Sequence, residues 1–165
     1  MKGIMFNTKY GLEQAVLNGT KTRTWRADKK PRYEVGEVVA IKQKYSDLDE
    51  TWRVAKGIFY GDCYLCTEYQ AGWNNKMFVK NELMPHKIKI TGIKQCYLQD
   101  ITEEECLREG IYEFLEGMFN FDNNNKLPWY DSAKEAFADL INKLNGKGYW
   151  ESNPLGYAYE FELVR

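Results

Sequence analysis

A short basic segment, Gly19 to Arg26, carries the residue types best suited to chemistry in this 165-residue chain. Lys21 and Thr24 stand three positions apart, and Arg23 lies between them. A partly desolvated lysine among other cations has a lowered pKa and can act as a base near neutral pH. A threonine hydroxyl close to it could serve as a nucleophile. The same segment also fits a sheet edge whose cations only contact phosphate, so both interpretations stay open.

The elements around this segment decide whether Lys21 and Thr24 can meet. Apolar spacing predicts a helix over 10–17 that stops at Asn18-Gly19, followed by an extended segment over 20–26. In an ideal strand Lys21 and Thr24 point to opposite faces. Their pairing therefore requires a turn or bulge between them.

Short strands and a few helices are predicted for the remaining chain. Thr102 and Glu105 form a capping-box pattern that predicts a helix to about Glu109 before Gly110. The stretch 61–83 shows no period and is predicted to be a long loop. A second helix is expected over 131–144, and strands over 3–7, 37–44, 53–60, 87–94 and 156–164. This pattern indicates one α+β domain with a barrel-like sheet, although periodicity does not say which barrel.

Composition limits the classes of partner. Aromatic residues make up 15% of the chain and the formal net charge is −1, so any nucleic-acid site must be a local patch. The densest positive stretch is 21–32. The sequence contains no run of 18 apolar residues and no secretory signal at its start, so we expect a cytoplasmic protein that does not span a membrane and whose four cysteines are thiols.

Metal and histidine chemistry have little support in the sequence. Cys63 and Cys66 form a CxxC pair, but the other candidate ligands, Cys96, Cys106 and His86, form no second close pair. We expect neither a metal nor a cofactor. His86 is the only histidine, and its place after Pro85 favours a surface turn over a catalytic base.

Several segments, in order, resemble the motifs of ASCH domains. The segment 18–26 is similar to the G-x-K-T-x-T-x-R signature, and 98–110 is similar to the LQDIT segment that follows it in the family. The remaining similarities are Val35-Gly36-Glu37 to the PGD turn, 77–78 with 84–85 to an FMP element, and 150–161 to the ending of phage-type members. The resemblance implies a PUA-like small β-barrel with flanking helices, spanning 1–165 as a single domain with insertions near 45–80 and 111–148.

The resemblance implies first a binding module. ASCH domains are generally proposed to bind RNA, so we expect RNA or a nucleotide-like small molecule in a cleft beside Lys21–Arg26. Local cations would contact phosphate, and aromatic faces would stack on bases. The residues expected to bind nucleic acid are Lys21, Arg23, Arg26, Trp25, Tyr45 and Trp73.

The alternative implied by the resemblance is an amidohydrolase. A small bacterial ASCH member hydrolyses the acetyl amide of 4-acetylcytidine. By motif, its lysine, threonine and glutamate fall on Lys21, Thr24 and Glu109 of this chain. Lys21 would be the base, Thr24 the nucleophile and Glu109 an acid/base or orienting group, while Arg26 could stabilise the oxyanion. A third interpretation is a phage-related interaction protein with no small-molecule cleft, and the oligomeric state is left open.

Overall fold

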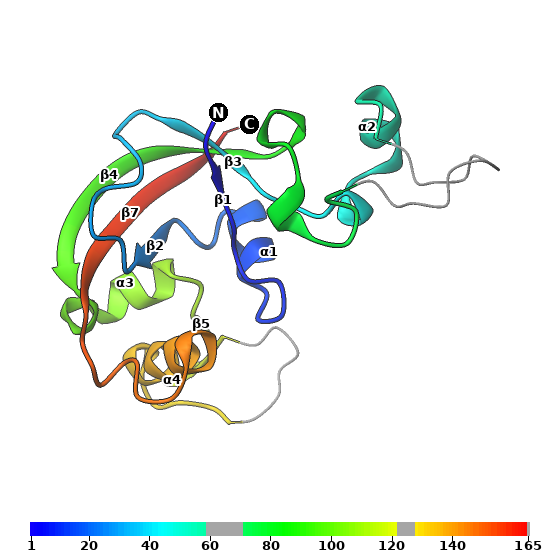
Figure 1. Cartoon of the computed structure of the whole chain (residues 1–165). Coiled ribbons are helices and arrows are strands. Elements are labelled where there is room, and N and C mark those ends of the chain that lie inside the picture. The colour runs from blue at the N-terminus through cyan, green and yellow to red at the C-terminus, as the bar shows by residue number, and fades with distance from the viewer. Residues whose placement is uncertain (59–70, 122–127, 165) are drawn as a thin grey trace. The chain divides into compact units, whose positions relative to one another are not determined.

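A computed structural model describes residues 1–58, 71–121 and 128–164, and these residues form two compact units (Figure 1). Of the described residues, unit 1 contains 1–6, 38–58, 71–88 and 164, and unit 2 contains 7–37, 89–121 and 128–163. The CxxC pair predicted as a metal candidate lies outside the described residues. No helix in the described ranges is long and apolar enough to cross a membrane.

Unit 1 is built on a short parallel pair of strands. Strand β1 (Gly3–Ile4) pairs with β3 (Val38–Ile41), with Gly3 opposite Ala40 and Ile4 opposite Ile41. Helix α2 (Glu50–Ala55) follows, and short 3-10 turns cover Tyr45–Asp47, Lys76–Phe78 and Asn81–Leu83. The apolar core of this unit contains Ala40, Tyr45, Leu48, Ile58, Trp73, Val79 and Met84.

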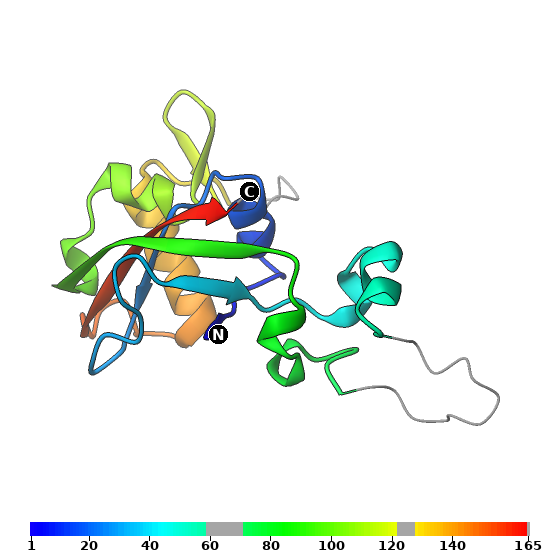
Figure 2. The same ribbon diagram turned by 90° about the horizontal axis from the view of Figure 1, so that it is seen from above.

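Unit 2 holds the long strands and the remaining helices. Strand β4 (Lys87–Tyr97) begins in unit 1 and continues here, where it runs beside β7 (Leu155–Val164) in both ribbon views (Figures 1 and 2). Strand β2 (Arg23–Arg26) pairs antiparallel with β7. The five strands hydrogen-bond in the order β1-β3-β4-β7-β2.

The helices of unit 2 pack around this sheet. Helix α1 (Leu12–Leu17) precedes β2, and helix α3 (Glu103–Arg108) contacts both β2 and α4 (Ala133–Asn145). A 3-10 turn, Leu98–Asp100, leads from β4 toward α3. A separate hairpin is formed by β5 (Tyr112–Leu115) and β6 (Met118–Asn120).

Helix α3 begins as the sequence predicts. The Thr102 hydroxyl accepts a hydrogen bond from the Glu105 amide at 3.2 Å, and the Glu105 carboxylate accepts one from the Thr102 amide at 2.9 Å. This reciprocal cap satisfies two amides that the first helical turn leaves without partners. It also fixes the direction in which the helix approaches β2.

Three expectations need correction. The described strands form a five-stranded sheet and a two-stranded hairpin, and no closed barrel is found among them, so the α+β class is confirmed but the PUA-like small β-barrel is not. The strand predicted over 53–60 is wrong over its described residues 53–58, because Glu50–Ala55 is helical with Asp49 as its N-cap and Val54 exposed. The hairpin of β5 and β6, inside the stretch 111–148, was not predicted.

Candidate functional site

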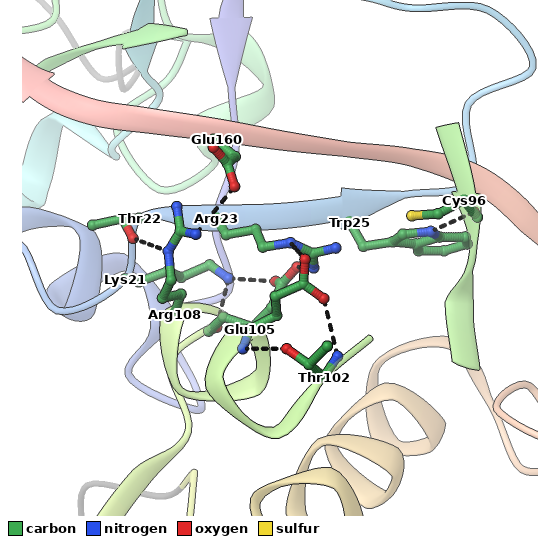
Figure 3. Close-up of polar contacts among 10 residues, drawn as sticks. Lys21, Thr22, Arg23, Trp25, Cys96, Thr102, Glu105, Arg108 and Glu160 are labelled. Atoms are coloured by element: carbon green, nitrogen blue, oxygen red, sulfur yellow. Dashed lines mark hydrogen bonds and ion pairs between the residues drawn. The ribbon is translucent and has the colours of Figure 1, made fainter. Parts of the chain in front are cut away.

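Lys21 lies buried at the entrance to β2. Its backbone amide donates to the Ala15 carbonyl at 2.8 Å, which ties it to the end of α1. Its side-chain amine donates to the Glu109 backbone carbonyl at 2.5 Å and to Glu109 Oε2 at 2.8 Å (Figure 3). Only 3% of Lys21 is exposed. The structure therefore brings together two of the three residues predicted to be catalytic, from positions 88 residues apart.

Glu109 owes its position to the end of α3 and to the glycine that follows. It is the C-cap of α3, and Gly110 turns the chain with φ of 107°. A Cβ at position 110 would lie 2.9 Å from Leu12 of α1. Glycine adopts this φ without strain and leaves room for the close approach. The Glu109 carboxylate is thereby directed at the β2 segment.

Arg23 binds the same carboxylate from the other side. Its Nη1 donates to Glu109 Oε1 at 2.8 Å, and its Nε lies 3.7 Å from Glu105 Oε1. The Arg23 and Lys21 side chains are each 2% exposed, and that of Glu109 is 5% exposed. Buried charges are costly unless they are paired and hydrogen-bonded. The Glu109 carboxylate supplies that pairing for both cations at once.

The buried cluster changes the pKa of Lys21. Burial lowers the pKa of its amine, and the neighbouring Arg26 and Arg23 lower it further, whereas Glu109 raises it. The net direction is downward. A lysine in this setting releases its proton more readily than one in water, which is the property required of a base.

A second, more exposed ion pair lies beside the first. Arg108 Nε donates to Thr22 Oγ1 at 3.1 Å, and its Nη1 donates to Glu160 Oε1 at 3.0 Å (Figure 3). The Thr22 amide donates to the Arg108 carbonyl at 3.0 Å. Helix α3 is thus joined to both β2 and β7. Sequence reasoning missed Glu105, Arg108 and Glu160, although Glu105 was recognisable as a capping residue close to the Glu109 motif.

Thr24 and Arg26 belong to the other side of β2. Successive strand residues alternate between faces, so Thr24 and Arg26 point away from the side that carries Arg23 and Trp25. Thr24 is 4% exposed and stands opposite Tyr159 of β7. Arg26 is half-buried and interacts electrostatically with Tyr33 and Glu109. The bulge that would turn Thr24 toward Lys21 is not found within β2, whose register with β7 is continuous.

Tyrosines and an aspartate surround this second side. The Tyr159 hydroxyl donates to Asp28 Oδ2 at 2.9 Å and accepts from the Arg32 amide at 2.9 Å. The Tyr33 and Tyr159 rings meet edge to face with centroids 5.2 Å apart. Burial raises the pKa of Tyr159 to about 12. These contacts hold the basic stretch 26–32 against β7.

The three aromatic residues predicted to stack on bases are buried. The Trp25 indole donates to the Cys96 carbonyl at 3.3 Å, and Trp25 is 8% exposed. Tyr45 and Trp73 lie in the core of unit 1, at 1% and 8% exposure. The Trp73 ring is covered by the Arg53 guanidinium, 4.9 Å from its centroid. The structure places all three in core packing and not on an open surface.

Comparisons with known proteins give one weak structural similarity. No protein-family model matches the chain, and no curated protein matches it. Among solved structures it is similar to the crystal structure of an ASCH domain from Lactobacillus crispatus JV V101, with 11% identity and a TM-score of 0.42. That match covers 96% of this chain and 75% of the other. A TM-score below 0.5 is too low to equate two folds, so the proposals below depend on side-chain geometry in unit 2.

Proposed function

We propose that this chain binds single-stranded RNA or a nucleotide-like ligand beside the Lys21–Arg26 segment. The observation that carries the proposal is an excess of cations over carboxylates at the segment. Lys21 and Arg23 pair with one buried carboxylate, that of Glu109, and Arg26 on the other side of β2 interacts with it electrostatically, while the partly exposed Glu105 lies 3.7 Å from Arg23. Three positive charges therefore meet two negative ones, and an anionic group is the natural complement.

Arg26 is the cation best placed to meet a ligand. It is half-buried, whereas Lys21 and Arg23 are buried and engaged with Glu109. Its side of β2 also carries Tyr33, Tyr157 and Tyr159, of which Tyr33 and Tyr159 are buried and Tyr157 is half-buried. A partly exposed aromatic ring next to an arginine suits a nucleotide, because bases stack on flat rings and phosphate binds guanidinium. Lys29, Lys30 and Arg32 extend the positive charge along an exposed loop.

Binding is tested with a fluorescent single-stranded RNA of about 12 nucleotides, followed by anisotropy from about 50 to about 200 mM salt. We expect Arg26→Gln to weaken binding and to reduce the magnitude of the logarithmic salt slope by about 0.7, the value for one phosphate contact on a single strand. Lys147→Gln removes the same charge from an exposed position after α4 and serves as the matched control. Equal affinities and slopes for the two variants would contradict the proposal. A single-stranded DNA of the same sequence tests whether the ribose 2′-hydroxyl contributes to the affinity.

A second candidate, an amidohydrolase acting on 4-acetylcytidine or a related acylated nucleoside, is favoured by the Lys21–Glu109 pair. The lowered pKa of Lys21 and its contact with Glu109 match a base and its orienting carboxylate. The β2 register places Thr24 on the other side of the strand, so this reaction requires the Thr24 side chain to turn toward Lys21 when substrate binds. The Thr24 oxygen would then attack the acetyl carbon and give its proton to Lys21. The carbon–nitrogen bond would then break, the cytosine amine would leave with a proton, and water would release acetate from Thr24.

This second candidate is tested by incubating the protein with 4-acetylcytidine and measuring acetate and cytidine. Thr24→Val keeps the size of the side chain but removes the nucleophile, and Thr24→Ser keeps a hydroxyl. We expect activity in wild type and in Thr24→Ser, none in Thr24→Val, and none in Lys21→Ala. The absence of turnover by the wild-type protein would exclude 4-acetylcytidine as a substrate. Turnover by Thr24→Val would exclude Thr24 as the nucleophile.

A further inference from the structure

A small cavity lies on the α3 side of the sheet in unit 2, beside the Lys21 site but not lined by Lys21. Its volume is about 240 Å³, and it is lined chiefly by Arg23, Gly92, Lys94, Glu105, Ala158 and Glu160. The cavity has room at its base because Gly92 has no side chain and Ala158 has only a methyl group. A Cβ at position 92 would lie 3.1 Å from the Glu160 carboxylate. The hollow is therefore a consequence of small residues at neighbouring positions of β4 and β7.

Arg23 supplies the cavity with an unused donor. Its Nη1 and Nε face Glu109 and Glu105, and within the described part of the chain its Nη2 has no hydrogen-bond acceptor. The Arg23 side chain is 2% exposed, and it lines the cavity. An oxygen of a ligand in the cavity could accept a hydrogen bond from Arg23 Nη2. The exposed Lys94 at the cavity edge adds a second positive charge.

Glu160 supplies the opposite polarity. Its Oε1 accepts from Arg108, and within the described ranges its Oε2 has no donor. Glu105 adds a second carboxylate to the wall, 23% exposed. Two cations and two carboxylates thus line one cavity, and their formal charges sum to zero. A dianion such as a phosphate monoester would be repelled by both carboxylates, and a simple cation would be repelled by both Arg23 and Lys94.

We propose that this cavity binds a small zwitterion, a free α-amino acid, whose carboxylate pairs with Arg23 and Lys94 and whose ammonium pairs with Glu160 and Glu105. A zwitterion has both charges within one small molecule and leaves the net charge of the site at zero, so each charged wall gains a partner. The residues known to line the cavity include no aromatic ring, which disfavours a stacked base. Ile93 and Ala158 leave an apolar surface for the amino-acid side chain. This proposal shares Arg23 with the nucleic-acid proposal but concerns a different ligand, which carries neither a base nor a phosphate.

The test uses nuclear magnetic resonance of ¹⁵N-labelled full-length protein titrated with L-alanine, L-leucine and L-glutamine. We expect saturable shifts of the Gly92 and Ala158 amides and of the Arg23 side-chain Nε–H. The tightest amino acid is then compared with its own deaminated acid and its decarboxylated amine. Each of these lacks one charge, so each should bind about tenfold or more weakly.

Two variants separate this cavity from non-specific charge effects. Glu160→Gln should weaken amino-acid binding about tenfold or more, because the ammonium loses its carboxylate. Glu162→Gln, at an exposed position on the same strand, should leave binding unchanged. Ala158→Leu should abolish binding by filling the base of the cavity, with retained dispersion of the spectrum as evidence of folding. The proposal is overturned if no amino acid shifts these resonances, if the half-molecules bind as well as the zwitterion, or if the two glutamate variants behave alike.

Discussion

The amine of Lys21 donates to both the backbone carbonyl and the side-chain carboxylate of Glu109, at 2.5 and 2.8 Å. One residue therefore holds the lysine by two independent oxygens. Arg23 holds the second oxygen of the same carboxylate. Because all three side chains are buried, the cluster fixes the end of α3 against β2 whatever ligand the protein binds.

The first prediction concerns the stability of this cluster. Glu109→Gln leaves buried Lys21 without its carboxylate partner and leaves Arg23 with only Glu105, at 3.7 Å, and we expect a loss of about 3–5 kcal/mol in the free energy of unfolding. Urea denaturation measures it. Glu162→Gln changes the same charge at an exposed site and should stay within about 0.5 kcal/mol of wild type. A Glu109→Gln protein as stable as this control would show that the pairs contribute little.

The second prediction concerns pH. Burial lowers the pKa of folded Lys21 below its ordinary value of 10.5. At pH values between the pKa of the folded protein and that of the unfolded chain, the unfolded chain therefore binds more protons than the folded protein does. The contribution of Lys21 to stability therefore rises with pH through this window and falls as the pH drops. We expect the stability difference between wild type and Lys21→Met to shift in favour of wild type from about pH 7 to about pH 10. Comparison with Lys21→Met cancels the titration of other groups, and a difference independent of pH would contradict the shifted pKa.

The third prediction concerns the contact between β7 and Trp25. A Cβ at Gly156 would lie 2.3 Å from the Arg26 carbonyl oxygen and 2.5 Å from the Trp25 ring. The Arg26 carbonyl oxygen belongs to the backbone, so it can shift only at a high cost in free energy. We therefore expect Gly156→Ala to destabilise the fold by about 1–3 kcal/mol or more. Thermal unfolding followed by tryptophan fluorescence measures this. Leu155→Ala, at an exposed neighbouring position, is the control, and equal melting temperatures for the two variants would disprove the close contact.

The fourth prediction concerns the described cysteines. Cys106 is buried, and burial together with Glu103 and Glu109 raises the pKa of its thiol to about 12. Burial also raises the pKa of Cys96. Since the thiolate is the reactive form, neither residue should be alkylated by iodoacetamide at about pH 8 in the folded protein, and both should be alkylated in denaturant. Peptide mass spectrometry locates the label, and rapid labelling of Cys106 under native conditions would contradict its burial.

Local features were predicted correctly where short-range chemistry decides the structure. The cap formed by Thr102 and Glu105 and the start of β4 at Lys87 follow from hydrogen-bonding groups and alternation within a few residues. So does the final strand, which is predicted over 156–164 and found over 155–164. The strand predicted over 53–60 overlaps the end of helix α2. The N-cap at Asp49 and the hydrogen bond from the Trp52 indole to the Leu83 carbonyl favour the helix instead.

The sequence by itself determined the α+β class, the ends of several elements and, through a family resemblance, the candidate residues Lys21 and Glu109. Only the tertiary structure decided that one carboxylate serves both Lys21 and Arg23, that Thr24 points to the other side of β2, and that Trp25, Tyr45 and Trp73 are buried. The physical reason is distance along the chain. Pairing across 86 and 88 residues depends on strand register and helix docking, which the free energy of the whole fold selects and no local pattern encodes.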